Sequence, residues 1–330
     1  MCTRCVRFAR EIPETAELMI DGRGNQSQID VFPGVARDNE LSAHVIDLCT
    51  AYAGREEMRD LTTLVGMAAR SLKAPLMIDS TTPDCIEACL RMYPGRCIVN
   101  SVNLEDGGAN LHRVLGLVKR YGAAVVALTI GEDGMAMTAD KKVAVARRIH
   151  EVAVDEFGLR PTDLFFDALT FTVGAGDENL RDAAIQTLEA IRRIKRELPG
   201  VFTVLGVSNI SFGLAPGARR VLNSVFLHDA VEAGLDAAIV DAGKVIPFAR
   251  ISPEDLDVCR DLLLDRVGDS EPSPLMRFID HFSEVDDDDS EAEAERSNHE
   301  EAQLSARVVD GEKEGVDDLL EMVHIVAEMK

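Results

Sequence analysis

The chain has 330 residues, a hydrophobic content of 46% and a formal net charge of −23 at pH 7. This length suits one large barrel or two ordinary domains, and the acidity argues against nucleic-acid binding, which needs basic patches. No apolar run approaches the roughly 18 residues of a membrane span, and the basic start lacks the apolar core of a signal peptide. Seven irregularly spaced cysteines are typical of reduced thiols. We therefore expect a soluble, cytoplasmic protein.

Residues 1–43 are polar and weakly periodic, with one weak strand candidate, IDVF at 29–32. Seven short apolar runs follow, at residues 44–49, 75–79, 96–100, 123–130, 163–169, 202–209 and 236–241. Such runs are typical of parallel strands that are buried on both faces. Helical spacing of apolar residues lies between them, most clearly at residues 55–72, 141–157 and 179–198.

This alternation predicts an α/β fold, a TIM-type (β/α)8 barrel that occupies residues 44–282. A closed barrel needs eight strands. The first strand therefore lies within residues 1–44, with 29–32 as its candidate, or it is missing or replaced. We expect a small irregular N-terminal segment and a C-terminal helix around this barrel.

The end of the chain begins with a dense acidic run at residues 284–301. We interpret residues 283–303 as a disordered linker, because like charges at this density resist collapse. The run lacks the glycine and the fixed spacing of a calcium-binding loop. Residues 304–330 have a helical pattern without a stop signal, which predicts the start of a further domain.

Polar residues follow each apolar run, where a parallel barrel places its catalytic groups. They are Asp47, Cys49, Asp79, Ser80, Thr81, Asn100, Ser101, Asn103, Thr129, Asp167, Ser208, Asn209, Ser211 and Asp241. Ser80, Thr81 and Thr82 fit a helix-capping role as well as a functional one. Asp79, Asn100, Asp167 and Asn209 form the stronger set, because unpaired polar groups at apolar strand ends are costly.

The composition of this set favours a neutral heterocycle as ligand. No GxGxxG or Walker sequence is present, which argues against dinucleotides and nucleoside triphosphates. A pterin ring offers N3–H and a 2-amino group, and one carboxylate accepts both in two parallel hydrogen bonds. An asparagine can pair with the remaining edge.

Five segments, matched in order, resemble the pterin-binding domain of cobalamin-dependent methionine synthase and related corrinoid methyltransferases. They are APLMIDST (74–81), IVNSVNLEDG (98–107), and residues 121–149, 165–178 and 203–241. VVDGEKEG (308–315) resembles the start of the cobalamin cap helices. The resemblance implies a methyltransferase that moves the N5-methyl group of methyltetrahydrofolate to a Co(I) corrinoid. It also implies that cobalamin and homocysteine are bound by other domains or proteins.

The same resemblance implies residue roles. Asp79, Asn100 and Asp167 would hold the pterin ring, Asn209 would hydrogen-bond near N5 as the catalytic residue, and Ser211 would join the binding set. The tertiary amine is a poor leaving group, so its departure needs protonation or hydrogen bonding at N5. No strong acid is evident near Asn209, and we expect positioning plus proton uptake from water.

A second resemblance covers residues 1–49. CTRCVRFAREI (2–12), GRGNQSQIDVF (22–32) and DNELSAHVIDLC (38–49) resemble the large iron–sulfur subunit of respiratory NADH dehydrogenase. It implies that Cys2, Cys5 and Cys49 are three ligands of an incomplete [4Fe–4S] set. The first cysteine of the usual triplet is absent, and Thr50 replaces the usual proline. An electron-transfer fragment is thus the alternative function, and a barrel that has lost catalysis is the third.

The two patterns meet at AHVIDLCTAYAG (43–54), where we favour a crossover between two sequences over a natural fusion. The remaining cysteines, Cys85, Cys89, Cys97 and Cys259, are predicted to be core residues. Three histidines on predicted helices are expected to serve packing or the surface, namely His112, His150 and His228.

Overall fold

Seven parallel strands form the central sheet of the protein. The computed structural model describes residues 18–21, 28–31, 44–51, 56–72, 74–241, 244–266 and 272–283. The sheet order is β11-β10-β9-β6-β5-β4-β3, and every neighbouring pair is parallel. The strands are β3 (Ile46–Cys49), β4 (Leu76–Asp79), β5 (Ile98–Val102), β6 (Ala124–Leu128), β9 (Leu164–Asp167), β10 (Phe202–Gly206) and β11 (Ala237–Ile239). All seven predicted strands are confirmed.

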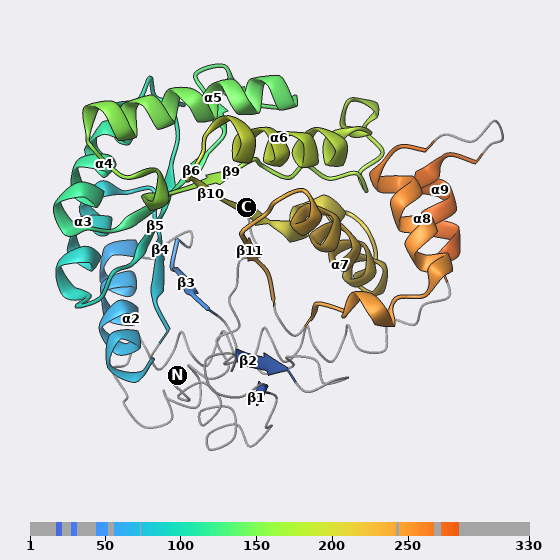
Figure 1. Cartoon of the computed structure of the whole chain (residues 1–330), viewed down its shortest axis with the longest axis horizontal. Coiled ribbons are helices and arrows are strands. Elements are labelled where there is room, and N and C mark those ends of the chain that lie inside the picture. The colour runs from blue at the N-terminus through green and yellow to red at the C-terminus, as the bar shows by residue number, and fades with distance from the viewer. Residues whose placement is uncertain are drawn as a thin grey trace.

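Helices surround this sheet on its outer side, and β3 and β11 are its two edges (Figure 1). The surrounding helices are α2 (Glu57–Ser71), α3 (Pro83–Met92), α4 (Ala109–Tyr121), α5 (Ala139–Glu151), α6 (Ala183–Glu197) and α7 (Pro216–Glu232). The seven strands curve into a barrel that is nearly closed. It is not fully closed, because within the described residues no hydrogen-bonded ladder joins β3 to β11. The prediction of a TIM-type barrel is confirmed, and seven of its eight strands are present among the described residues.

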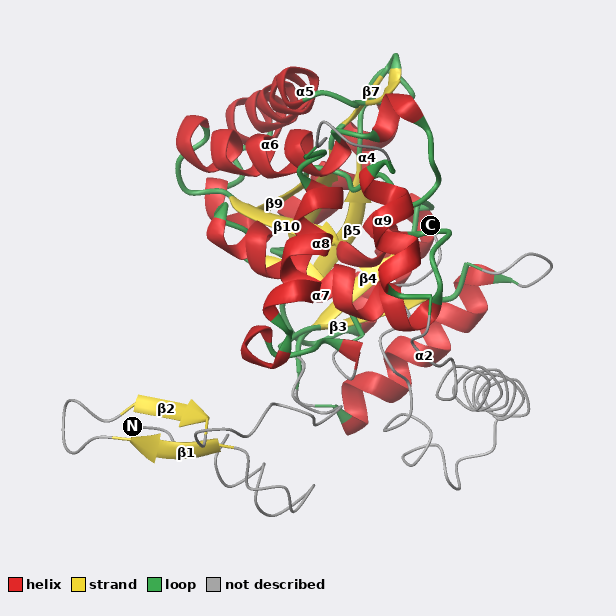
Figure 2. Cartoon of the chain, turned by 90° about the vertical axis from the view of Figure 1, so that its right-hand side faces the viewer, coloured by secondary structure: helices red, strands yellow, loops and turns green. Residues whose placement is uncertain are grey.

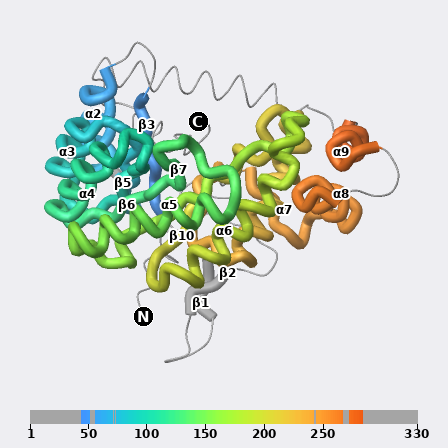
Figure 3. The backbone as a smooth tube through the Cα atoms, turned by 90° about the horizontal axis from the view of Figure 1, so that it is seen from above, coloured from blue at the N-terminus to red at the C-terminus, as the bar shows by residue number. Residues whose placement is uncertain are grey.

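Shorter elements complete the described chain. Beyond α7, helices α8 (Pro253–Leu263) and α9 (Pro274–His281) pack against each other (Figure 3). Strands β7 (Ile130–Gly131) and β8 (Gly134–Met135) form a hairpin after β6. The π-helical turn η3 (Val152–Glu156) extends α5, and four 3₁₀ turns are η4 (Pro161–Asp163), η5 (Glu178–Leu180), η6 (Val207–Ser211) and η8 (Phe248–Arg250). None of the described helices is long and apolar enough to span a membrane.

The N-terminal strand candidate takes no place in the barrel. Strand β2 (Gln28–Val31) pairs antiparallel with β1 (Leu18–Asp21), and these two form a sheet of their own (Figure 2). The candidate strand at residues 29–32 was therefore wrong as the first barrel strand. Its backbone groups pair with those of β1 instead. The predicted linker after Ser283 and the helix at 304–330 lie outside the described residues.

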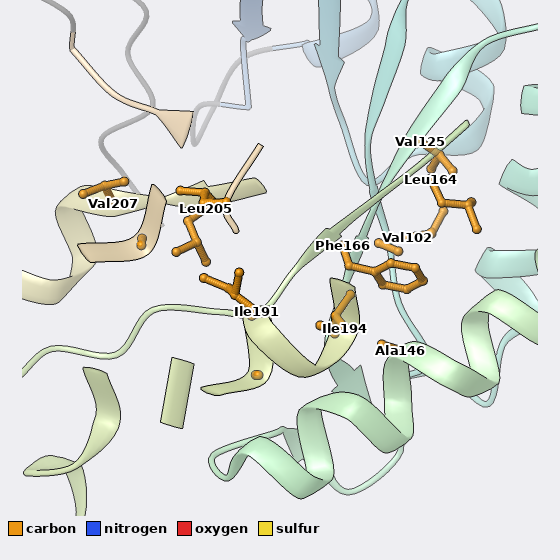
Figure 4. Packing of buried hydrophobic residues seen from close by; sticks show 14 of the residues in the cluster. Val102, Val125, Ala146, Leu164, Phe166, Ile191, Ile194, Leu205 and Val207 are labelled. Carbon is orange, nitrogen blue, oxygen red and sulfur yellow. The ribbon is translucent and has the colours of Figure 1, made fainter. Parts of the chain in front are cut away.

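The outer face of the sheet carries the main hydrophobic core. Val125, Leu164 and Phe166 are completely buried under α5 and α6, where they meet side chains such as Ala146 and Ile194 (Figure 4). Each large apolar side chain buried in this way contributes about 1.5–3 kcal/mol. This packing explains why the strand sequences are nearly continuous in apolar residues.

The inner face of the sheet encloses a smaller apolar cluster, which we call the lumen floor. Met77, Val126 and Val204 are its buried members. Half-buried side chains pack against them, namely Val45, Ile98, Leu128, Phe165, Ala237 and Ile239. Because successive side chains of a strand alternate between faces, the residue two positions after a floor residue also faces the lumen. This rule brings polar residues to the carboxyl-end mouth of the barrel.

Candidate functional site

Polar side chains line the lumen directly above the floor. Asp79 follows Met77 by two positions, Asn100 follows Ile98, and the register sets Asp79 opposite Asn100 on neighbouring strands. Asn100 Nδ2 donates to Asp47 Oδ2 at 3.5 Å, across the intervening strand β4. These side chains therefore share one layer at the mouth. Asp47 was among the strand-end residues but was left out of the predicted binding set.

Asp167 reaches the same layer from the other side of β6. It ends β9, two positions after the floor residue Phe165, and is in register with Leu128 of β6 and Val204 of β10. Burial raises the pKa of Asp167 to about 6, against the opposing effects of the Leu169 and Gly206 N–H groups and the Lys142 charge. At neutral pH the side chain is mainly a carboxylate, and thus an acceptor for ring donors.

The turn after Asp167 has an unusual backbone. Leu169 has a φ of 57°, in the left-handed region that costs a non-glycine residue about 1–2 kcal/mol. In this conformation the Leu169 N–H donates to Asp167 Oδ1 at 2.7 Å. The Leu169 carbonyl in turn accepts hydrogen bonds from Thr187 Oγ1 at 2.9 Å and from Lys142 Nζ at 3.0 Å. The surrounding side chains hold the turn that supplies Asp167 with a backbone donor.

Sequence reasoning missed Lys142. It is completely buried in the first turn of α5, although lysine is almost never fully buried without a partner. A signal was present, because Lys142 falls on the buried stripe of α5 that contains Ala139, Ala146 and Ile149. A charged residue in line with an apolar stripe indicates a partner inside the protein.

Asn209 lies in the turn η6, which follows β10. A Cβ atom added at Gly206 would lie 4.0 Å from Asn209 Nδ2, so the amide lies over the end of β10, the strand next to the one that ends in Asp167. The loops after β9 and β10 are tied together, since Val173 N donates to Ile210 O at 3.0 Å. The structure therefore brings Asp167 and Asn209 to one corner of the mouth.

Ser211 is completely buried at the end of the same turn. Its Oγ donates to Ser208 O at 3.0 Å and accepts from Arg219 Nε at 3.1 Å. Arg219 also donates to Ser208 O at 3.4 Å. The Ser211 hydroxyl thus holds the loop that carries Asn209.

Ser80 and Thr82 belong to a network at the start of α3. Ser80 Oγ donates to Glu57 Oε1 at 2.5 Å and accepts from Thr82 N at 3.1 Å. Thr82 Oγ1 donates to Glu57 Oε2 at 3.2 Å. These bonds join α2 to α3 and give both hydroxyls structural partners, but Thr82, the N-cap residue of α3, makes no side-chain capping bond, so the predicted capping role is wrong for Thr82.

The cysteines divide into two groups. Cys49 is exposed at the end of β3, and its predicted co-ligands Cys2 and Cys5 lie outside the described residues. In the described ranges no three His, Cys, Asp or Glu side chains are grouped to hold a metal ion. The predicted core cysteines are confirmed as buried, namely Cys85, Cys89, Cys97 and Cys259. Burial raises the pKa of Cys89 and of Cys259 to about 12, which keeps these thiols protonated.

The predicted helical histidines are also placed on helices, His112 on α4, His150 on α5 and His228 on α7. None of the three is on a strand end at the mouth of the barrel. His112 Nδ1 pairs with Gly108 O at 2.7 Å within its own helix, and His228 stacks on Phe248 with ring centroids 3.7 Å apart. His112 is exposed and the other two are half-buried, which agrees with the predicted packing or surface role.

Two family models match the chain. The model described as pterin binding enzyme matches residues 36–241. The model of the NADH-quinone oxidoreductase subunit 3, ferredoxin-like domain, matches residues 1–53. The two matches overlap at residues 36–53, the region where the two sequence resemblances meet.

Two curated relatives are methionine synthases. The Mycobacterium tuberculosis protein is 42% identical over 297 residues, which cover 88% of this chain and 25% of the relative. The Mycobacterium leprae protein is 43% identical over 290 residues, which cover 86% of this chain and 24% of the relative. The chain therefore spans about a quarter of the length of these relatives.

Among solved structures, the chain is similar to dihydropteroate synthase from Stenotrophomonas maltophilia, with a TM-score of 0.48 and 19% identity over 66% of this chain and 82% of that one. The dihydropteroate synthase of Xanthomonas albilineans has a TM-score of 0.48 and 21% identity, over 62% of this chain and 76% of that one. The pterin-binding match, by contrast, extends over more than half of the chain. The chain belongs to the pterin-binding enzyme family.

Proposed function

We propose that the chain binds methyltetrahydrofolate by its pterin ring at the mouth of the barrel and presents the N5-methyl group to a Co(I) corrinoid. The observation that carries this proposal is the polar layer of Asp79, Asn100 and Asp167 above an apolar floor. A flat ring needs apolar contact on its faces and hydrogen bonds at its edge, and this layer offers both.

The three polar side chains divide the ring edge between them. A carboxylate accepts N3–H and the 2-amino group together, while an amide both donates and accepts. Asp167 is the proposed acceptor of the paired donors, because burial makes its hydrogen bonds stronger than those of a solvated carboxylate. Asp79 and Asn100, adjacent across β4 and β5, would complete the recognition.

Asn209 is the proposed catalytic residue. Its place over the end of β10, the strand next to the one that ends in Asp167, suits an amide that hydrogen-bonds at N5 of the ring. In the transfer, the bond between N5 and the methyl carbon breaks, the electron pair stays on N5, and N5 takes a proton from water. A hydrogen bond at N5 stabilises the charge that develops there. Ser211 contributes by fixing the loop.

The corrinoid supplies the nucleophile for the methyl group when it is bound by its own domain or protein. The methionine synthase relatives are about four times as long as the aligned region, which agrees with further domains for the corrinoid and for homocysteine. Methionine synthesis by the whole assembly is part of the same proposal.

Isothermal titration with two ligands tests the binding claim. We expect 5-methyltetrahydrofolate to bind at one site per chain. The matched ligand p-aminobenzoylglutamate, which has the folate tail without the pterin ring, should bind far more weakly. A folded chain that binds both equally, or neither, contradicts the proposal. Methyl transfer is then followed anaerobically, from the loss of Co(I) absorbance when free cob(I)alamin is added.

A cluster-binding function for the N-terminal segment is the second candidate, and the match of residues 1–53 to a ferredoxin-like domain favours it. Cys2, Cys5 and Cys49 would supply three of four thiolates. Anaerobic reconstitution with iron and sulfide tests it, with about one cluster per chain and a brown colour as the expected result. A reconstituted chain that holds far less iron than one cluster per chain contradicts this function.

A further inference from the structure

The completely buried Lys142 is not explained by the helix in which it lies. It stands in the first turn of α5, near the positive end of the helix dipole, where a cation is disfavoured. Removal of an ammonium group from water is also costly. Neither effect favours a lysine at this position. The groups around the Nζ atom must therefore stabilise it.

Two backbone carbonyls and an aromatic ring surround that atom. Nζ donates to Ala168 O and, at 3.0 Å, to Leu169 O, and it lies 4.8 Å from the centroid of the Phe171 ring. All three residues belong to the loop that begins directly after Asp167. The lysine therefore joins α5 to the loop at the carboxyl end of β9.

One residue, Leu169, connects the hydrogen bonds of Lys142 to the Asp167 carboxylate. The Leu169 carbonyl is fixed by Lys142 and by Thr187, whose Oγ1 donates at 2.9 Å. Fixing this peptide keeps Leu169 in its left-handed conformation, from which its N–H reaches Asp167 Oδ1 at 2.7 Å. Without these donors, the turn would have no support for a conformation that leucine rarely adopts.

We propose that Lys142 is a positioning residue for Asp167: it holds the turn that orients the carboxylate, and it places a positive charge on the loop that begins directly after that carboxylate. The proposal rests on the function proposed for the barrel mouth, because it assigns Asp167 to the pterin ring.

The electrostatics of the pair agree with this geometry. Burial lowers the pKa of Lys142 to about 8, against the opposing effect of Asp167, so the amine is charged at pH 7. Burial raises the pKa of Asp167 to about 6, against the opposing effects of two backbone N–H groups and Lys142. For either group, the only charged side chain of the described residues that shifts its pKa is the other one. Asp47, Asp79 and Asn100 face the same lumen from β3, β4 and β5, respectively.

The first test compares Lys142→Met with Lys119→Met. Methionine keeps an apolar stem of similar length but removes the charge and the donor. Lys119 is a matched control, because its Nζ also donates to a backbone carbonyl, that of Gly158, which precedes β9 rather than following it. The dissociation constant for 5-methyltetrahydrofolate is measured from pH 5.5 to 9 for each variant and for the wild type. At each pH the variant value is divided by the wild-type value, which removes the effect of the ligand's own titration.

We expect the pH below which Lys142→Met loses affinity to rise by about one unit, since the Lys142 charge acts to lower the pKa of Asp167 and a nearby opposite charge lowers a carboxyl pKa by about 1–3 units. A rise of that size makes binding at pH 6 about fivefold weaker than in the wild type. Lys119→Met should leave the profile unchanged. A Lys142→Met profile that coincides with the wild-type profile overturns the proposal.

A second measurement needs no ligand and separates this proposal from the function itself. The Asp167 carboxyl carbon is titrated by ¹³C NMR, with its signal assigned by its loss in Asp167→Asn. In Lys142→Met the pKa of Asp167 should rise, and an unchanged pKa overturns the proposal even where the ligand binds. A raised pKa in a chain whose wild type binds no folate supports the Lys142 role and rejects the proposed function alone. Should Lys142→Met not fold, Lys142→Gln, which keeps a donor without the charge, serves the same titration.

Discussion

The two ends of strand β9 carry aspartates in opposite situations. Asp163, just before the strand, accepts hydrogen bonds from Arg96 and, at 2.8 Å, from Arg160. Burial acts to raise the pKa of Asp163, but the hydrogen bonds and charges of the two arginines outweigh it and hold the pKa below its usual value. Asp167, at the other end, has its pKa raised to about 6 by burial.

This difference separates a structural carboxylate from one that is suited to a ligand. The arginines neutralise Asp163 within the chain, at the amino end of the barrel. Asp167 accepts from a backbone N–H and lies near one buried lysine, in a layer with Asp79 and Asn100. In a parallel barrel the carboxyl ends of the strands form the functional face and the amino ends serve stability. The following predictions test whether β9 obeys that division.

Removal of the Asp167 carboxylate should have the largest effect. Asp167→Ala deletes two charge-assisted hydrogen bonds to the ring, each worth about 1.5–3 kcal/mol. Affinity for 5-methyltetrahydrofolate should fall at least about 100-fold, as measured by isothermal titration at pH 7.5. Normal binding by this variant means that the site assignment is wrong.

The partner experiment changes Asp163, the matched aspartate at the other end of β9. Asp163→Ala removes the acceptor shared by Arg96 and Arg160 and should lower the free energy of unfolding by about 1–3 kcal/mol, as measured by urea denaturation. Affinity for the folate should stay within error of the wild-type value. A variant that loses folate affinity but no stability contradicts the division between the two ends.

Replacement of Asn209 should separate transfer from binding. Asn209→Ala removes a hydrogen bond that gains strength only as charge develops on N5, so the transfer rate should fall by about ten- to a hundredfold. The dissociation constant should change by less than about threefold, because the ring edge keeps its partners. An equal loss in affinity and rate would assign Asn209 to ring binding instead.

The pH dependence of the wild type should give the smallest effect. Since Asp167 must be ionised to accept the ring donors, affinity should fall by about tenfold per unit below pH 6. The sign for stability is opposite: because the folded chain binds this proton more tightly, Asp167 contributes stability at low pH that is lost as the pH rises through about 6. Asp167→Asn should remove both trends, and an unchanged profile in that variant assigns them to another group.

Much of this organisation follows from the sequence. Runs such as PLMID (75–79) and LFFD (164–167), followed by helical spacing, predict buried parallel strands because both of their faces are covered, and alternation then sets Asp79 and Asp167 in the lumen. The sequence did not predict that β2 would pair with β1 instead of with a barrel strand. A short strand of four residues can form hydrogen bonds with either neighbour. Lys142 was missed because its partners are carbonyls, which leave no trace in the residue types of the loop.

A crystal structure of the chain with 5-methyltetrahydrofolate bound tests the central claim most directly. We expect the pterin ring at the carboxyl-end mouth of the barrel, with N3 and the 2-amino group within hydrogen-bond distance of the Asp167 carboxylate. Asp79 and Asn100 should contact the rest of the edge, and Asn209 should lie near N5. A ring bound elsewhere, or in the lumen with its donor edge turned away from Asp167, would contradict the account.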